Sequence, residues 1–196
     1  TKRPAVYNRE KFDRYVKKWV KFLKGHPMTG EGLPTYGSAG LVSKANATNA
    51  LPTHNFRSGH SADAHFVSGE TLAAENLVRN AGCVSCPIRC ERRVLVDGKE
   101  VKGPEYETCG FFGPNIDATS MENMLRLNYQ CDLLGVDTIS LASTIAFAME
   151  LKEHGLADFG LDFGNSDNLI AAVEKIARRE GIYSELANGS KWLSEK

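Results

Sequence analysis

The chain has 196 residues, of which 42% are hydrophobic and 24% are charged, so it holds enough apolar surface for one or two globular domains and is not a disordered segment. Lysine plus arginine and aspartate plus glutamate both total 24, and this balance gives no indication of a nucleic-acid partner. The sequence shows no apolar signal segment and no stretch long enough to span a bilayer, so we expect a soluble, cytoplasmic protein without a membrane partner.

The first thirty residues are predicted to form a helix followed by a linker. Apolar side chains recur at steps of three and four over residues 9–24, which is typical of an amphipathic helix, and Gly25 and Pro27 end it. Residues 30–68 are rich in Gly, Pro, Asn, Ser and Thr and have no regular apolar period. An irregular stretch of this length is uncommon in a compact protein and favours a binding loop.

The remainder is predicted to be mainly helical. A helix is expected over residues 70–80, and a β-hairpin over 93–102, where Asp97-Gly98 separates two short apolar runs. Periodicity and capping residues predict helices over 120–134, 137–154 and 167–180, the last one capped by Asp167 and closed by Gly181, with short helices near 183–187 and 190–195. The predicted fold class is therefore mainly α, a helical domain with long irregular loops and a short β-hairpin. Residues 1–30 precede one central helical domain over 31–196.

Three of the five cysteines, Cys83, Cys86 and Cys90, form a C-x2-C-x3-C run. A disulfide scaffold would need more cysteines in a smaller chain. Thiolates at this spacing can face one concavity if the backbone turns sharply, as Gly82 and Pro87 would permit. Iron–sulfur clusters require such an arrangement, because each iron takes one protein thiolate.

The spacing leaves other interpretations open. C-x2-C is also half of a structural zinc site, although zinc ribbons and fingers supply a second pair. Radical-SAM enzymes use the reverse order, and the bacterial ferredoxin run has a different spacing. A third alternative is a set of packed thiols without metal. Cys109 and Cys131 are expected to be buried core thiols and not ligands.

Five motifs occur in an order that closely resembles the aldehyde ferredoxin oxidoreductase family. They are Leu51-Pro-Thr-His-Asn-Phe56, Ser68-Gly-Glu70, the cysteine run, Gly103-Pro-Glu-Tyr-Glu-Thr108 and Asp132-Leu-Leu-Gly-Val-Asp-Thr138. The resemblance covers residues 51–196 and implies the first helical domain of that family. The chain is then a central fragment without the N- and C-terminal domains, and the fourth cluster cysteine is expected after Lys196.

The resemblance also implies cofactors. They are a [4Fe-4S] cluster and a tungsten (or molybdenum) held by two pterins, with magnesium as a bridge between the pterin phosphates. In this interpretation Cys83, Cys86 and Cys90 hold the cluster as metal ligands. Asp132, Gly135 and Asp137 would bind a pterin, since a carboxylate accepts paired N–H donors and glycine allows close approach. The alternative is that Asp132 and Asp137 only cap the helices that flank Gly135.

Two glutamates are the catalytic candidates. The resemblance places Glu107, and with it Glu105, near the metal, where a carboxylate in a dry pocket could act as a general base. The alternative is that both are ordinary solvated charges. His54, His60 and His65 are expected to be surface or satisfied histidines, with His54 of most interest because it lies in a shared motif.

The function that the resemblance implies is oxidation of an aldehyde to a carboxylic acid. Electrons would leave through the cluster to ferredoxin or an electron-transfer subunit. The partners are then the aldehyde substrate, the remaining domains of the enzyme and, as one assembly, a homo-oligomer. The positions that match the family's subunit-bridging Glu-x-x-His pairs are residues 126–129 and 174–177, which lack histidine, so no bridging metal is expected. The alternatives are a related tungsten-dependent reductase, for example of aromatic rings, and a non-catalytic iron–sulfur or zinc-binding module.

Overall fold

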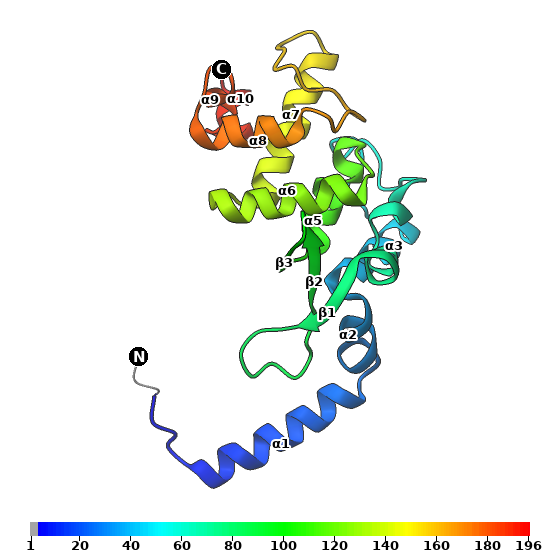
Figure 1. Ribbon diagram of the computed structural model, residues 1–196, viewed down its shortest axis with the longest axis vertical. Helices are drawn as coiled ribbons and strands as arrows, with labels where there is room; N and C mark the ends of the chain where they lie inside the picture. Colours follow the sequence, from blue (N-terminus) through cyan, green and yellow to red (C-terminus); the bar gives the residue numbers. More distant parts are fainter. Residues whose placement is uncertain (1–3) are drawn as a thin grey trace.

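The computed structural model describes residues 4–196, so the first three residues of the predicted N-terminal segment lie outside the described part. The molecule is elongated and curved (Figure 1). A helical body forms one end, a three-stranded antiparallel sheet lies in the middle, and the N-terminal helix extends at the other end. The mainly helical fold class predicted from the sequence is confirmed.

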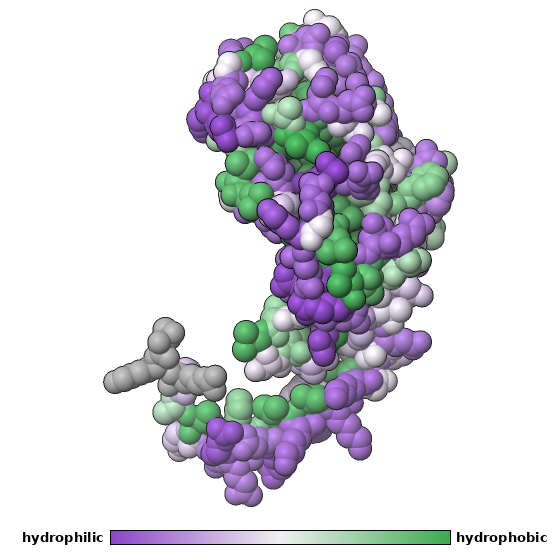
Figure 2. Space-filling model, viewed as in Figure 1, coloured by the Kyte–Doolittle hydropathy of each residue, from purple (hydrophilic) through white to green (hydrophobic). Residues whose placement is uncertain are grey.

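Helix α1 spans Arg9–Gly25 and confirms the first predicted helix. The Asn8 side chain caps it by accepting the Lys11 backbone N–H at 2.9 Å. None of its residues is buried, so its apolar stripe has no partner within residues 4–196. Figure 2 shows hydrophobic side chains along the side of α1 that faces the hollow of the molecule. The most exposed apolar members of α1 are Phe12, Tyr15, Val16, Trp19 and Phe22.

The stretch from Gly30 to Ser68 is more regular than predicted. A π-helical turn (Pro27–Gly32) leads into α2 (Leu33–Tyr36), and a 3-10 turn (Ser38–Gly40) leads into α3 (Leu41–Ala47). A second 3-10 turn covers Ala64–Val67. These pieces are too short for an apolar period to be detected in the sequence. Residues 48–63 are irregular, as expected, apart from an isolated bridge between Thr53 and Ser58.

The prediction of a helix over residues 70–80 is wrong beyond residue 76. After α4 (Gly69–Thr71) and a π-helical turn (Leu72–Asn76), the chain forms strand β1 (Leu77–Ala81). Strand β1 pairs antiparallel with β2 (Glu91–Val96), which pairs with β3 (Lys99–Lys102) and confirms the predicted hairpin. Pairing with a strand that lies ten residues further along the chain overrides the local helical preference of so short a segment.

The helical body begins with α5 (Tyr106–Phe111), which the sequence did not predict, and a 3-10 turn (Pro114–Ile116). Helices α6 (Met121–Leu134) and α7 (Thr138–Glu153) confirm the predictions. Helix α8 (Leu169–Arg178) has its N-cap at Asn168, one residue after the expected Asp167, and ends with Arg179 in the left-handed region, before Gly181. The short helices α9 (Tyr183–Leu186) and α10 (Ser190–Ser194) follow as expected.

Helix α6 contributes to three separate apolar clusters. Leu127 belongs to the large cluster shared with α7 and α8, Met124 to one shared with residues 39–67, and Leu125 to one shared with the sheet. Cys109 and Cys131 are fully buried in these clusters, which confirms that they are core thiols. Burial raises the pKa of Cys131 to about 12, so its thiol stays protonated at neutral pH.

Within residues 4–196 no single helix is long and apolar enough to cross a membrane. Helices α6 and α7 meet that criterion only when they are taken together, and they are bent by 116° where they join.

The structure explains why the Ser68-Gly-Glu70 motif has glycine at its centre, and this gives a first prediction. A Cβ atom on Gly69 would lie 2.3 Å from the Gly40 nitrogen and 2.7 Å from the Tyr36 carbonyl oxygen, so these backbones approach as closely as glycine allows. Gly69→Ala should lower the free energy of unfolding by about 1–3 kcal/mol, the usual cost of overpacking, as measured by urea denaturation.

Gly110→Ala is the matched control. Gly110 lies in α5, and its Cβ would meet only the Leu51 side chain, at an ordinary 3.7 Å. Alanine should be neutral or stabilising there, because it favours helix more than glycine does. Equal urea midpoints for the two variants would contradict the close approach at Gly69.

Candidate cofactor site

The cysteine run occupies the loop that joins β1 to β2. Antiparallel pairing places Ala81 opposite Glu91, so both ends of the loop meet at one edge of the sheet. A Cβ on Gly82 would lie 2.9 Å from the Arg89 Cα, which makes glycine necessary for this closure. Cys86 donates its backbone N–H to the Cys83 carbonyl at 3.0 Å, and this tight turn covers the C-x2-C half of the run.

The three thiols of this loop are free and accessible to different degrees. Cys83 is exposed, whereas Cys86 and Cys90 are half-buried. Burial and the Glu105 carboxylate raise the pKa of Cys90, and the neighbouring thiols add to this effect. Within the described chain, no three His, Cys, Asp or Glu side chains are arranged so that they could hold a metal ion. The donor atoms fit an iron–sulfur cluster in type and in loop position, but the loop does not by itself close a metal site.

The base of this loop is anchored by Arg92, a buried residue of β2. Its Nη1 donates to the carbonyl oxygens of Pro34 (2.8 Å) and Thr35 (2.9 Å), and its Nη2 donates to that of Arg89 (2.8 Å). Asn80 at the end of β1 also donates to Pro34, at 2.7 Å. The C-terminal carbonyls of α2 are thereby satisfied by the two strands that hold the cysteine loop.

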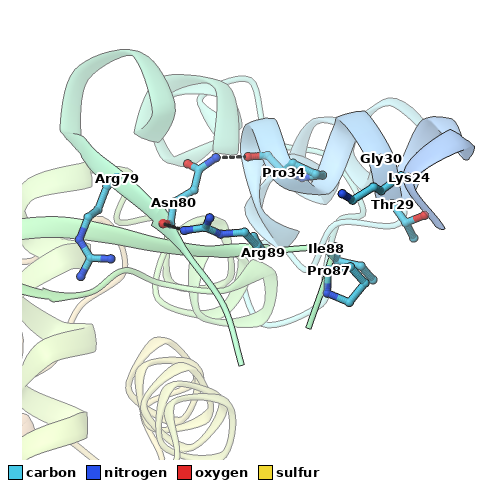
Figure 3. A pocket seen from close by; sticks show the side chains of 9 residues that line it. All are labelled: Lys24, Thr29, Gly30, Pro34, Arg79, Asn80, Pro87, Ile88 and Arg89. Atoms are coloured by element: carbon cyan, nitrogen blue, oxygen red, sulfur yellow. Dashed lines mark hydrogen bonds between the residues drawn. The ribbon is translucent and has the colours of Figure 1, made fainter. Parts of the chain in front are cut away.

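A hollow of about 670 Å³ lies behind the loop (Figure 3). Figure 3 shows Asn80 pointing toward Pro34, and the Arg89 side chain reaching the Asn80 carbonyl, at 3.1 Å. Three cations, Lys24, Arg79 and Arg89, line the hollow, and no acidic side chain does. Arg79 is paired with Glu100 outside this lining. The hollow therefore favours an anionic group.

The Gly-Pro-Glu-Tyr-Glu segment follows β3 and opens helix α5. The Ser38 hydroxyl donates to the Glu105 carboxylate and accepts the Tyr106 backbone N–H at 3.0 Å, so another segment caps this helix. The Lys102 ammonium lies 3.5 Å from Glu105. Glu107 is exposed in the first turn of α5. Residues 4–196 hold Glu105 in place, but they do not enclose Glu107 in the dry pocket that a general base needs.

The Asp132-x-x-Gly135-x-Asp137 motif lies between α6 and α7. Gly135 adopts a φ of 66° at the end of α6, where the Val136 N–H donates to the Cys131 carbonyl at 3.0 Å. The Asp137 carboxylate accepts the Ser140 N–H at 2.7 Å, which lowers its pKa and confirms the predicted capping of α7.

The alternative interpretation, in which Asp132 only caps a helix, is wrong. Asp132 lies inside the last turn of α6, where the helix dipole disfavours an anion, and Gly135 is the capping residue. Its side chain is exposed and forms no hydrogen bond or ion pair with any residue of the described chain. The Asp132 carboxylate is therefore available to a ligand.

The two motifs that follow the cysteine run are joined by one hydrogen bond, which links the Thr108 and Thr138 hydroxyl groups at 2.9 Å. The cysteine loop extends from the end of the sheet that lies away from this contact (Figure 1). The C-terminal end of α6 and the cysteine loop nevertheless face the same concave side. The structure thus joins the Gly-Pro-Glu-Tyr-Glu and Asp-x-x-Gly-x-Asp motifs through Thr108 and Thr138. Glu105 lies close enough to Cys90 for its carboxylate to add to the effect of burial and raise the pKa of that thiol.

His54 is a satisfied histidine, as expected. Its Nδ1 forms a hydrogen bond with the Asp117 carboxylate, and its Nε2 lies 3.2 Å from the Glu153 carboxylate. Its ring stacks on the Phe163 ring, with 3.9 Å between the ring centroids. His60 and His65 are exposed. None of the three lies in a set of side chains that could hold a metal within residues 4–196.

Sequence reasoning missed Arg92 and Ser38. For Arg92 a signal was present, because residues 92, 94 and 96 alternate on the buried side of β2. A charged side chain in an inward-facing strand position indicates a special role. Ser38 gave no such signal, because its partners are 67 and 68 residues away.

Comparison with known proteins defines the class. The fold matches that of a solved structure, the active site complex BamBC of benzoyl coenzyme A reductase with 1,5 dienoyl-CoA, with a TM-score of 0.70 at 21% identity over 95% of this chain and 30% of that one. The sequence model described as aldehyde ferredoxin oxidoreductase, domains 2 and 3, matches residues 14–196. The chain belongs to the aldehyde ferredoxin oxidoreductase family, which confirms the resemblance seen in the motifs.

Curated relatives extend this result. The tungsten-containing aldehyde ferredoxin oxidoreductase of Pyrococcus furiosus is 40% identical over 204 aligned positions, which cover 100% of this chain and 34% of the relative. The protein of the same name from Thermococcus kodakarensis is 38% identical, with the same coverage. The aliphatic sulfonate oxidoreductase, WOR-like subunit, of Pyrococcus furiosus is 29% identical over 95% of this chain and 31% of its own length. The chain spans about a third of the length of these relatives.

The capping role of Asp137 gives a prediction about stability. Asp137→Ala should lower the free energy of unfolding by about 0.5–2 kcal/mol, whereas Asp137→Ser should keep the cap. The pKa of Asp137 is lowered in the folded state, so its stabilisation is present above the unfolded pKa and is lost as the pH falls through the folded pKa. Urea denaturation at neutral and acid pH measures both effects.

Asp132→Ala is the control for this pair. Because Asp132 has no partner in the described chain, its removal should leave stability unchanged or slightly increased. A loss at Asp132 as large as that at Asp137 would contradict the assignment of the cap.

Proposed function

We propose that the chain is the central part of a tungsten–pterin enzyme that oxidises aldehydes to carboxylic acids. One observation carries the proposal: the three thiols of residues 83–90 lie on a single glycine-closed loop, in a chain that is 40% identical to relatives named tungsten-containing aldehyde ferredoxin oxidoreductase. When bound, the cluster and the metal–pterin group would supply the one- and two-electron chemistry.

Cys83, Cys86 and Cys90 would hold a [4Fe-4S] cluster on this loop. Three thiolates leave one iron of such a cluster without a protein ligand, so the fourth thiolate comes from another part of the protein. The exposure of Cys83 leaves the loop open to that contribution.

Asp132 and Asp137 would accept N–H donors of a pterin ring on either side of Gly135. Asp132 is the stronger candidate, because its carboxylate is unpartnered in the described chain whereas that of Asp137 already accepts the Ser140 N–H. Magnesium would belong to the pterin phosphates, and the cationic hollow lined by Lys24, Arg79 and Arg89 would attract such anions.

Glu107 would act as the general base, with Glu105 as its support. Glu105 is fixed by Ser38 and Lys102, whereas Glu107 is exposed and free to meet substrate. Its exposure requires that the remaining domains cover it, because a general base is most effective where water is excluded. Its role is to accept a proton at its carboxylate.

The remaining domains of the enzyme are the first partner that the surface supports, because the apolar stripe of α1 needs a cover. Ferredoxin or an electron-transfer subunit would then receive electrons from the cluster in the cytoplasm. A related tungsten-dependent reductase is the second candidate function, and the BamBC-like fold favours it.

Metal content tests the proposal. The full-length protein that contains this chain, prepared without oxygen, should hold tungsten and about four irons per chain, and should absorb light at about 400 nm. Cys86→Ser should lower the iron content, whereas Cys109→Ala, which removes a buried thiol outside the loop, should preserve it. Zinc alone without this absorption would refute the proposal. A loaded protein that fails to oxidise aldehydes but reduces aromatic acyl-CoA esters would favour the second candidate.

Glu107→Gln tests the proposed base. Turnover of an aldehyde at saturating concentration should fall by roughly 10²–10⁴-fold, the usual contribution of a general base, while iron content and visible spectrum stay unchanged. Glu122→Gln is the control, since Glu122 is also an exposed glutamate in the first turn of a helix. Unaltered turnover in Glu107→Gln would remove Glu107 from the catalytic residues.

A further inference from the structure

Arg92 is a buried cation that has no anionic partner in the described chain. Its side chain is among the largest that are fully buried, and the whole residue is 2% exposed. Within residues 4–196 it forms no ion pair, and its hydrogen bonds go only to backbone carbonyls. Its Nε–H is buried and has no acceptor. A buried charge is costly unless an opposite charge compensates it.

The neighbouring charges do not supply this compensation. Arg93, the next residue of β2, also has a buried Nε without an acceptor, but its guanidinium is paired with the Glu91 carboxylate at 2.6 Å. Glu105 lies in the same region, yet its carboxylate is bound by the Ser38 hydroxyl and lies 3.5 Å from Lys102. Glu105 is thus a charged neighbour of Arg92 but not its ion-pair partner, and Arg92 differs from Arg93 in having no ion pair within the described chain.

The position of Arg92 indicates where its counter-charge belongs. A Cβ placed on Gly37 would lie 2.9 Å from the Cys90 carbonyl oxygen and 3.3 Å from the Arg92 Nε. The Arg92 Nη2 also holds the carbonyl of Arg89, the residue before Cys90. The free Nε–H and the third cysteine of the run thus flank the same glycine, and the guanidinium fixes the backbone on which that cysteine depends.

We propose that Arg92 is the positioning residue and the buried counter-charge of the thiolate-bound cluster. The inference rests on the proposed function, because it requires an anionic cluster at Cys83, Cys86 and Cys90. A fixed cation beside the cluster favours the more negative, reduced state, so Arg92 raises the reduction potential. Arg92 keeps its proton throughout, because a guanidinium stays charged at all physiological pH values. One electron enters or leaves the cluster, and no atom of Arg92 is transferred.

The test is a redox titration of the full-length protein, with the reduced cluster followed by electron paramagnetic resonance. Arg92→Gln should shift the midpoint potential to a more negative value at unchanged iron content. Arg92→Lys, which keeps a charge but moves it and removes the Nε donor, should shift it in the same direction by a smaller step. Arg93→Gln and Arg93→Lys are the matched controls and should leave the potential at the wild-type value.

Each outcome separates this inference from the function on which it rests. If the wild-type protein lacks a cluster, the proposed function fails and the inference falls with it. If the cluster is present but Arg92 variants have the wild-type potential, or Arg93 variants shift as far, only the inference is overturned. Should Arg92→Gln not accumulate as folded protein, the comparison of Arg92→Lys with Arg93→Lys decides: a wild-type potential in Arg92→Lys, or an equal shift in Arg93→Lys, overturns the inference.

Discussion

The arrangement of the helical body depends on one constraint, namely that the broad apolar side of α6 must pack into three clusters at once. Successive residues on a helix are rotated by about 100°, so Met124, Leu125 and Leu127 point in different directions and enter different apolar clusters. The helix cannot rotate or slide without exposing at least one of them. Its last turn and the motif that follows it therefore have a fixed position, and this fixes the carboxylates of Asp132 and Asp137 relative to the sheet.

A second constraint acts on the same face of the sheet, at the end that carries the cysteine loop. Helix α2 is only four residues long, and its final carbonyls have no partners inside the helix. Arg92 and Asn80 supply the missing donors, and Ser38, just beyond the helix, holds Glu105 and Tyr106. The need to satisfy backbone groups thus joins two motifs, the cysteine run and the Gly-Pro-Glu-Tyr-Glu segment, that lie far apart in the sequence.

The sequence predicted those elements whose signals are local and long. The stripe of α1 and the spans of α6 and α7 were found because each involves neighbouring residues over several turns. Strand β1 was missed because it is five residues long and exists through pairing with β2. At the site, the motifs indicated the cysteines and the Asp-x-x-Gly-x-Asp segment, and they left open the capping that Asp137 provides, but they did not distinguish Asp132, which is unpartnered in the described chain. The role of Arg92 could not be predicted in full, because the carbonyl groups that it binds in α2 are nearly sixty residues away in the sequence.

The exposed stripe of α1 has a consequence for how the protein is made in the cell. A newly synthesised chain would present Phe12, Trp19 and Phe22 to the surroundings of the ribosome, and no later segment up to residue 196 folds over them. Such a surface is a preferred target for chaperones and for unwanted association with other nascent chains.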